Sequence, residues 1–271
     1  MSRIIIGFNS FKPCDRNFVA LDSWNHLKQQ QLVHDVVDVQ FVGDSNHEHV
    51  TTVDELRRDS SMFVNNSTKK LPVVKDILDV LADQSCDYFI FTNSDVIINK
   101  NLIKHINKHK PQAFACSRMN INQIESFDNV LNQEITPTRY EVAGFDTFVF
   151  QKEWYIDNNH VFNDYLIGMP VWDVVYAGMI KLFAGNHPLG NQNPPFCFHV
   201  EHDITWQHDL EAPERVYNQQ LREQTHLDKL VFSIFDRYIV DVLIRRKPNG
   251  AFMIPHHNET DIELQYFNNF K

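Results

Sequence analysis

Short apolar runs alternate with longer amphipathic stretches along the first 120 residues of the chain. The apolar runs are bounded by polar turn residues and predict strands at residues 3–8, 36–42, 88–91 and 113–117. Apolar positions at helical spacing predict helices at residues 16–32, 71–81 and 99–108, the last with Asn99 as its N-cap. Residues 45–67 are polar and mixed, so we expect a loop there with at most a short helix. This alternation predicts an α/β fold with a mostly parallel central sheet flanked by helices.

The second half of the chain continues with fewer and less regular elements. We expect a strand at residues 147–150, a helix at 174–183 and an apolar strand that leads into His199. From Glu211 to about Leu243 the pattern is helical. No flexible linker precedes this segment and it is too short to build its own core. We therefore expect a catalytic domain at residues 1–210 and a helical C-terminal extension at residues 211–271 that packs on it.

Composition and charge exclude several classes of protein. The chain has 271 residues, 43% of them hydrophobic, which suffices for a sizeable core. Its formal charge of −10 argues against a nucleic-acid partner, because such proteins normally present a basic surface. No apolar run approaches the length of a membrane span, and no Cys-x-x-Cys zinc motif occurs. The apolar run near Met1 is shorter than the core of a secretory leader, so we do not expect one. We expect a cytoplasmic protein without a transmembrane segment, and peripheral membrane association stays open.

The sequence Thr92-Asn93-Ser94-Asp95 interrupts the apolar residues of the third predicted strand. In open α/β sheets, ligands bind just beyond the carboxyl ends of the strands. Mg²⁺ and Mn²⁺ favour oxygen ligands, often one or two carboxylates completed by substrate phosphates. Asp95 is therefore a candidate metal ligand. The alternative is a capped turn before the helix that begins near Asn99.

His199 and His202 follow an apolar run and are three residues apart. On an extended strand they would face opposite sides, so only one of them would face Asp95. Histidine is a common metal ligand, but a polar surface loop would explain the same pattern.

Two further groups contain candidate substrate contacts. Asp173 follows Trp172 at the start of a predicted helix and is either a general base or a residue favoured there by the helix dipole. Trp172 could stack on a sugar ring or pack in the core. Gly144 and Asp146 precede a strand, where Asp146 could bind sugar hydroxyls or form a turn.

Together these segments resemble the glycosyltransferases of the GT-A fold, in particular the family-2-like nucleotide-diphospho-sugar transferases. Over about residues 1–210, the segments that carry the resemblance occur in the expected order: the first strand with Asn9, Asn93-Ser94-Asp95, the segment from Gly144 to Phe150, the segment from Ile167 to Asp173, and His199 to Trp206. Asn93 stands at the first position of the family's Asp-x-Asp motif, whereas the last Asp is kept as Asp95.

The resemblance implies a hexosyltransferase-type enzyme that moves a sugar from a nucleotide-diphosphate sugar to a glycan or other hydroxyl acceptor. It implies Mn²⁺ or Mg²⁺ on Asp95 and on His199 or His202, and donor contacts from Asn9, Asn93, Ser94 and Asp95. It also implies acceptor or sugar contacts from Gly144, Asp146 and Trp172. With Asp173 as the base, the transfer would be direct and the anomeric configuration would invert.

Two other functions fit parts of the sequence. A sugar nucleotidyltransferase could use a similar sheet, but the segment after the first strand lacks the Gly-rich basic loop that grips a triphosphate. The chain carries neither a Gly-x-Gly-x-x-Gly dinucleotide motif nor a Gly-Lys-Ser/Thr phosphate loop. A non-catalytic carbohydrate- or metal-binding module would be distinguished by its failure to hydrolyse a nucleotide sugar.

Overall fold

A six-stranded sheet forms the centre of the computed structural model, which describes residues 2–10, 15–42, 50–67, 69–121, 139–140, 145–185, 196–200 and 211–233. The strand order is β3-β2-β1-β4-β9-β6. The strands are β1 (Ile4–Phe8), β2 (Asp35–Phe41), β3 (Thr51–Leu56), β4 (Tyr88–Thr92), β6 (Ala113–Cys116) and β9 (Thr147–Gln151). Pairing is parallel from β3 to β4, and β9 runs antiparallel to both β4 and β6. The predicted mostly parallel sheet is confirmed.

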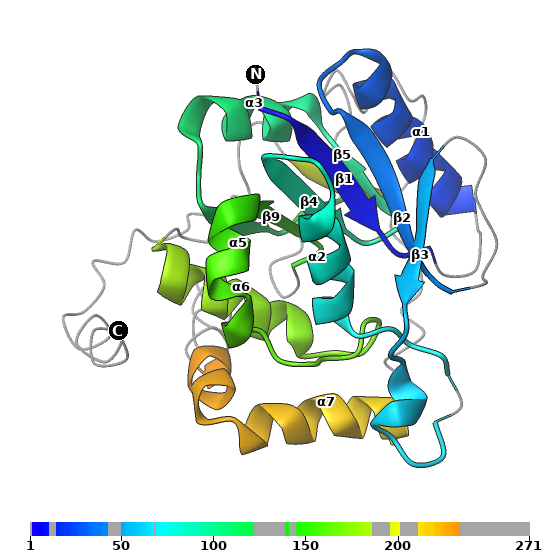
Figure 1. Ribbon diagram of the computed structural model, residues 1–271, viewed down its shortest axis with the longest axis vertical. Coiled ribbons are helices and arrows are strands. Elements are labelled where there is room, and N and C mark those ends of the chain that lie inside the picture. Colours follow the sequence, from blue (N-terminus) through cyan, green and yellow to red (C-terminus); the bar gives the residue numbers. More distant parts are fainter. Residues whose placement is uncertain are drawn as a thin grey trace.

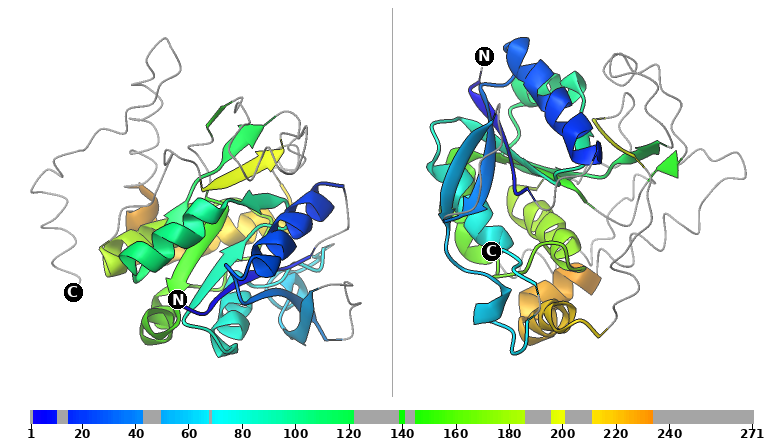
Figure 2. Two further views of the ribbon diagram at one scale, coloured as in Figure 1. Left: turned by 90° about the horizontal axis from the view of Figure 1, so that it is seen from above. Right: turned by 90° about the vertical axis from the view of Figure 1, so that its right-hand side faces the viewer.

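Helices cover both faces of this sheet (Figures 1 and 2). One face packs against α1 (Asp15–Gln29) and α3 (Lys100–His109). The other packs against α2 (Val74–Asp83), α5 (Lys152–Asn158) and α6 (Trp172–Ala184). Successive residues of β4 divide between these two cores, with Tyr88 and Ile90 on the first face and Phe89 and Phe91 on the second. This division explains why residues 88–91 of β4 are all apolar, since a strand covered on both sides has no solvent-facing positions.

The predicted helices are present, and the N-cap of α3 is as expected. The Asn99 side chain accepts a hydrogen bond from the Asn101 backbone N–H. The prediction of a loop at residues 45–67 is wrong, because Thr51–Leu56 forms edge strand β3, followed by the short helix η1 (Ser60–Met62). An edge strand exposes much of its surface and is often polar, so the hydrophobic pattern did not reveal it.

A second, smaller sheet has the order β5-β10-β7-β8. It contains β5 (Val96–Ile98), β7 (Met119–Ile121), β8 (Arg139–Tyr140) and β10 (Cys197–Val200). Strand β10 pairs antiparallel with β5 and parallel with β7. Because β5 follows β4 after three residues, this sheet is joined directly to the carboxyl end of the central strand.

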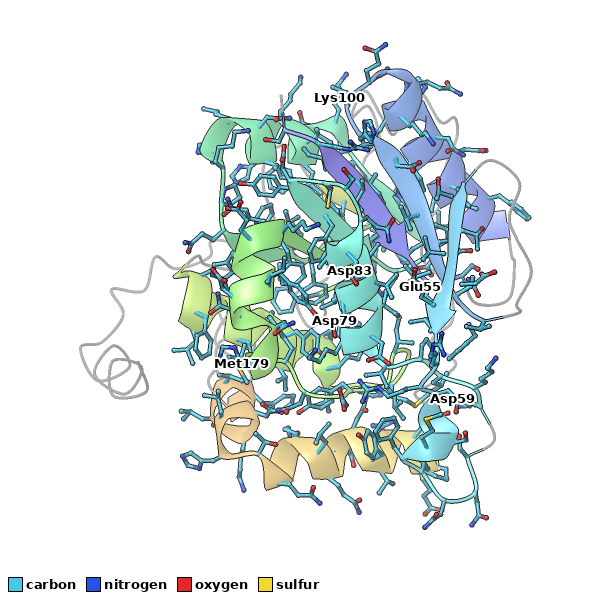
Figure 3. The ribbon with its side chains drawn as sticks, in the orientation of Figure 1. Glu55, Asp59, Asp79, Asp83, Lys100 and Met179 are labelled. Atoms are coloured by element: carbon cyan, nitrogen blue, oxygen red, sulfur yellow. The ribbon has the colours of Figure 1, made fainter. Side chains whose placement is uncertain are left out.

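Helix α7 (Pro213–Gln224) lies beside η1, where Tyr217 packs near Phe63, and along the segment that precedes α6 (Figures 1 and 3). Helical residues 226–233 follow it. The buried Asp228 carboxylate accepts hydrogen bonds from the Tyr165 hydroxyl and the Asn163 amide. The proposed division at residue 210 stays a prediction, since residues 234–271 lie outside the described part. Within the described residues, no helix is both long and apolar enough to cross a membrane.

Candidate active site

Asn93 and Asp146 meet at the carboxyl end of β4. The pairing of Thr92 with Thr147 places the residue after β4 beside the residue before β9. The Asn93 side-chain amide donates to Asp146 Oδ1 at 2.6 Å, and the Asn93 backbone N–H donates to the Asp146 carbonyl at 3.1 Å. The Arg118 guanidinium forms an ion pair with Asp146. The carboxylate of Asp146 is therefore held by both a neutral donor and a cation.

Asp95 and His199 form a second pair on the same side of β4. His199 stands opposite Val96 in the antiparallel pairing of β10 with β5, so its ring comes next to the residue before Val96. His199 Nε2 lies 3.2 Å from Asp95 Oδ2. The imidazole is almost completely buried, whereas the carboxylate keeps about a fifth of its surface exposed. His199 is thus the described histidine of the pair that contacts Asp95, and which of the two binds a metal stays open.

Asp173 lies in the first turn of α6, where its Oδ2 accepts a hydrogen bond of 3.3 Å from the Phe145 backbone N–H. The residue keeps some accessible surface, yet protein surrounds the carboxyl closely. Desolvation, and next the nearby Asp146 carboxylate, raise the pKa of Asp173 to about 6, despite opposing backbone hydrogen bonds. Burial therefore outweighs the lowering of the Asp173 pKa that the helix dipole would cause. With this pKa, the carboxylate is suited to accepting a proton near neutral pH.

Trp172 and Asn9 have partners within the protein. The Trp172 indole is 5% exposed and packs against Phe91, Phe148 and Tyr176, with ring centroids 5.2–6.0 Å apart. These contacts favour the packing role, and its stacking on a sugar stays a prediction. The Asn9 amide donates to the Val39 carbonyl at 2.7 Å and so fastens the segment after β1 to β2.

The remaining predicted site residues are less informative. Ser94 lies in the turn between Asn93 and Asp95 and is partly exposed. Gly144 and His202 lie outside the described residues, so their proposed contacts stay predictions.

Arg118 is the residue of this site that the sequence analysis missed. It comes two residues after β6, at the same edge of the sheet as Asp146, and its Nε donates to Asn120 Oδ1 at 3.2 Å. A charged residue directly after a short apolar strand was the available signal, since the same rule identified Asp95.

The donor set of Asp95 and His199 is chemically suited to a divalent metal. A carboxylate oxygen and an imidazole nitrogen are both ligands of borderline ions such as Mn²⁺. Among the described residues, no cluster of three or more His, Cys, Asp or Glu side chains could hold a metal. A cation here would thus need further ligands from the substrate, from water or from the segment that includes His202.

The fold matches those of solved glycosyltransferase structures. The mannosyltransferase PcManGT from Pyrobaculum calidifontis, in complex with GDP-Man and Mn²⁺, has a TM-score of 0.51 at 11% identity, covering 88% of this chain and 70% of that one. S. aureus TarS 1–349 gives a TM-score of 0.47 at 13% identity, covering 83% and 73%. The same TarS region in complex with UDP-GlcNAc gives 0.45 at 12% identity, covering 74% and 59%. No protein-family model matches the chain, and the comparison with curated proteins found no match.

The central sheet flanked by helices is accordingly that of a glycosyltransferase fold, and PcManGT is the structure that carries this conclusion.

Proposed function

We propose that this chain is a GT-A-type glycosyltransferase that moves a hexose from a nucleotide-diphosphate sugar to an acceptor hydroxyl, with inversion at the anomeric carbon. The observation that carries the proposal is Asp173, whose pKa is raised to about 6 at the sheet edge that also holds Asp95 and Asp146. PcManGT was solved with a nucleotide sugar and Mn²⁺, which supports the donor class.

In the proposed reaction, the acceptor hydroxyl oxygen attacks the anomeric carbon of the donor. The bond from that carbon to the diphosphate oxygen breaks, and the nucleoside diphosphate leaves with the electron pair. The acceptor proton passes to the Asp173 carboxylate. A general base contributes about a hundredfold to ten-thousandfold in rate, and its pKa is best placed near the working pH.

The donor would lie against the segment from Asn93 to Asp95 and the loop after β1. Asp95 and His199 would hold a divalent cation, which supplies positive charge to the departing diphosphate. Asn93 and Arg118 orient Asp146, which is thereby fixed as a hydrogen-bond acceptor for sugar hydroxyls. We also propose a cytoplasmic location, in keeping with the few and widely spaced cysteines of the sequence.

The test is the Asp173→Asn variant, which keeps the shape of the side chain and removes its basicity. Turnover should be measured over a panel of nucleotide sugars with Mn²⁺, together with donor affinity by calorimetry. We expect turnover to fall by about a hundredfold or more with donor affinity nearly unchanged. Normal turnover by Asp173→Asn would reject Asp173 as the base, and a retained anomeric configuration in the product would reject direct displacement.

A further inference from the structure

The Asn218 side chain on helix α7 forms hydrogen bonds with the segment that leads into Asp173. Asn218 is fully buried on α7. Its Oδ1 accepts from the Leu166 backbone N–H at 2.9 Å, and its Nδ2 donates to the Leu166 carbonyl at 3.0 Å. The same Nδ2 lies 3.3 Å from the Pro170 carbonyl and 3.5 Å from the Met169 carbonyl. One amide therefore satisfies polar groups at both ends of the turn at residues 166–170.

This turn ends in an unfavourable backbone conformation. Val171 has φ 95° and ψ −44°, which is a rare outlier for a β-branched residue. Such conformations are strained and persist only where the surroundings enforce them. Val171 is buried and immediately precedes Trp172 and Asp173, the first residues of α6. The direction in which α6 begins thus depends on how firmly the turn is held.

The two sides of the turn are held by different parts of the chain. On one side, Leu166 forms an isolated β-bridge with Val73, and the Ile167 N–H donates to the Pro72 carbonyl. On the other side, Asn218 of α7 makes polar contacts to the backbone of Leu166, Met169 and Pro170. Tyr217, its neighbour on α7, instead donates to the Asp164 carbonyl at 3.1 Å, upstream of the turn.

We propose that Asn218 is a positioning residue for the general base, because it fixes the 166–170 turn and, through Val171, the place of the Asp173 carboxyl. This inference rests on the proposed function of Asp173. It assigns the C-terminal helix a role in the reaction, although no α7 side chain is required to touch a substrate.

The experiment is a double-mutant cycle of Asn218→Ala and Asp173→Asn in the full chain, with turnover of nucleotide sugars and Mn²⁺ as the readout. Small displacements of a catalytic group cost on the order of ten- to a hundredfold in rate. We expect Asn218→Ala to lower kcat by such a factor with donor affinity unchanged. In the Asp173→Asn background, the same substitution should have little further effect, because residues that act through one group are not additive.

Two further variants separate positioning from general destabilisation. Tyr217→Phe removes only the hydrogen bond to the Asp164 carbonyl and keeps the ring that packs beside Leu166 and Met169, so it should leave kcat near that of the wild type. Gly168→Ala strains the backbone of the turn itself, because Gly168 has φ 75°, a conformation that residues with a Cβ rarely adopt. The added Cβ would meet no atom within 4 Å, so the substitution introduces no steric clash. It should reproduce the loss of kcat even if Asn218→Ala does not fold.

The outcomes distinguish this inference from the proposed function. Additive losses in the two backgrounds, or equal losses for Asn218→Ala and Tyr217→Phe, would overturn the positioning role. So would normal kcat in both Asn218→Ala and Gly168→Ala, while Asp173→Asn remained inactive. Normal turnover by Asp173→Asn would instead overturn the proposed function, and the inference with it.

Discussion

His199 Nε2 lies 3.2 Å from Asp95 Oδ2, although 104 residues separate the two in the chain. The contact follows from strand pairing, since His199 on β10 stands opposite Val96 on β5. A carboxylate and an imidazole brought together at the end of the central strand form the start of a metal-binding site.

Asp95→Ala and His199→Ala should each weaken Mn²⁺-dependent binding of a nucleotide sugar by about tenfold or more, because each removes one proposed ligand. Calorimetry with and without Mn²⁺ measures the effect. His160→Ala is the matched control, because His160 is exposed and follows α5, at the opposite end of β9 from Asp146. Unchanged metal-dependent affinity in both site variants would reject this pair as the metal site.

Asp173→Asn should make the protein more stable at neutral pH while making it less active. The folded-state pKa of Asp173 is raised from 3.8 to about 6, so its ionisation destabilises the fold. The protonated carboxyl therefore stabilises the wild-type fold. Its stabilising contribution is fully present below about pH 4 and is lost as the pH rises through 6. Relative to wild type, the variant should gain about 1–3 kcal/mol in free energy of unfolding, developing between pH 4 and 6.5 and constant above.

Denaturant unfolding across that pH range checks this prediction, with Asp157→Asn at an exposed site of α5 as the control. A pH-independent difference between Asp173→Asn and wild type would contradict the raised pKa. The pH dependence of activity should show the same pKa, so kcat/KM should fall as the pH drops below about 6.

Asn93→Asp should destabilise the protein, even though it creates an Asp-x-Asp sequence. The Asn93 amide donates to Asp146 Oδ1 at 2.6 Å, and a carboxylate there would replace a donor with a second negative charge. We expect a loss of about 1–3 kcal/mol in free energy of unfolding at pH 7, since a buried acceptor loses its donor. Thermal or denaturant unfolding measures it, with Asn65→Asp at an exposed position as control. Equal stability of the two variants would show that the Asn93–Asp146 contact contributes little.

Removal of residues 211–271 should leave a protein that is insoluble or lacks fixed tertiary packing. The deletion removes Asp228, which accepts hydrogen bonds from Tyr165 and Asn163, and Asn218, which accepts one from the Leu166 backbone N–H. Near-UV circular dichroism and dye binding should report lost packing with retained secondary structure. A soluble 1–210 fragment with a sharp thermal transition would contradict the prediction.

The sequence alone was enough to predict those helices and strands whose hydrophobic pattern reflects the burial of their residues. Residues 88–91 of strand β4 are all apolar because both faces of the strand are covered, and α3 begins at Lys100, directly after Asn99, whose side chain caps it. The polar residues that interrupt these patterns, from Asn93 to Asp95, marked the carboxyl end of the sheet. Edge strand β3 was missed because its side chains are largely exposed, so its pattern resembles that of a loop.

Contacts between residues far apart in the chain, and the pKa values of the groups that they enclose, became visible in the tertiary structure alone. The antiparallel entry of β9 beside β4 joins Asp146 to Asn93, and the pairing of β10 with β5 brings His199 to Asp95. The raised pKa of Asp173 arises from enclosure by segments far apart in the chain, and Asn218 reaches the turn at residues 166–170 from a helix about fifty residues later. Local pattern carries no information on such contacts, because burial and charge proximity are properties of the packed chain.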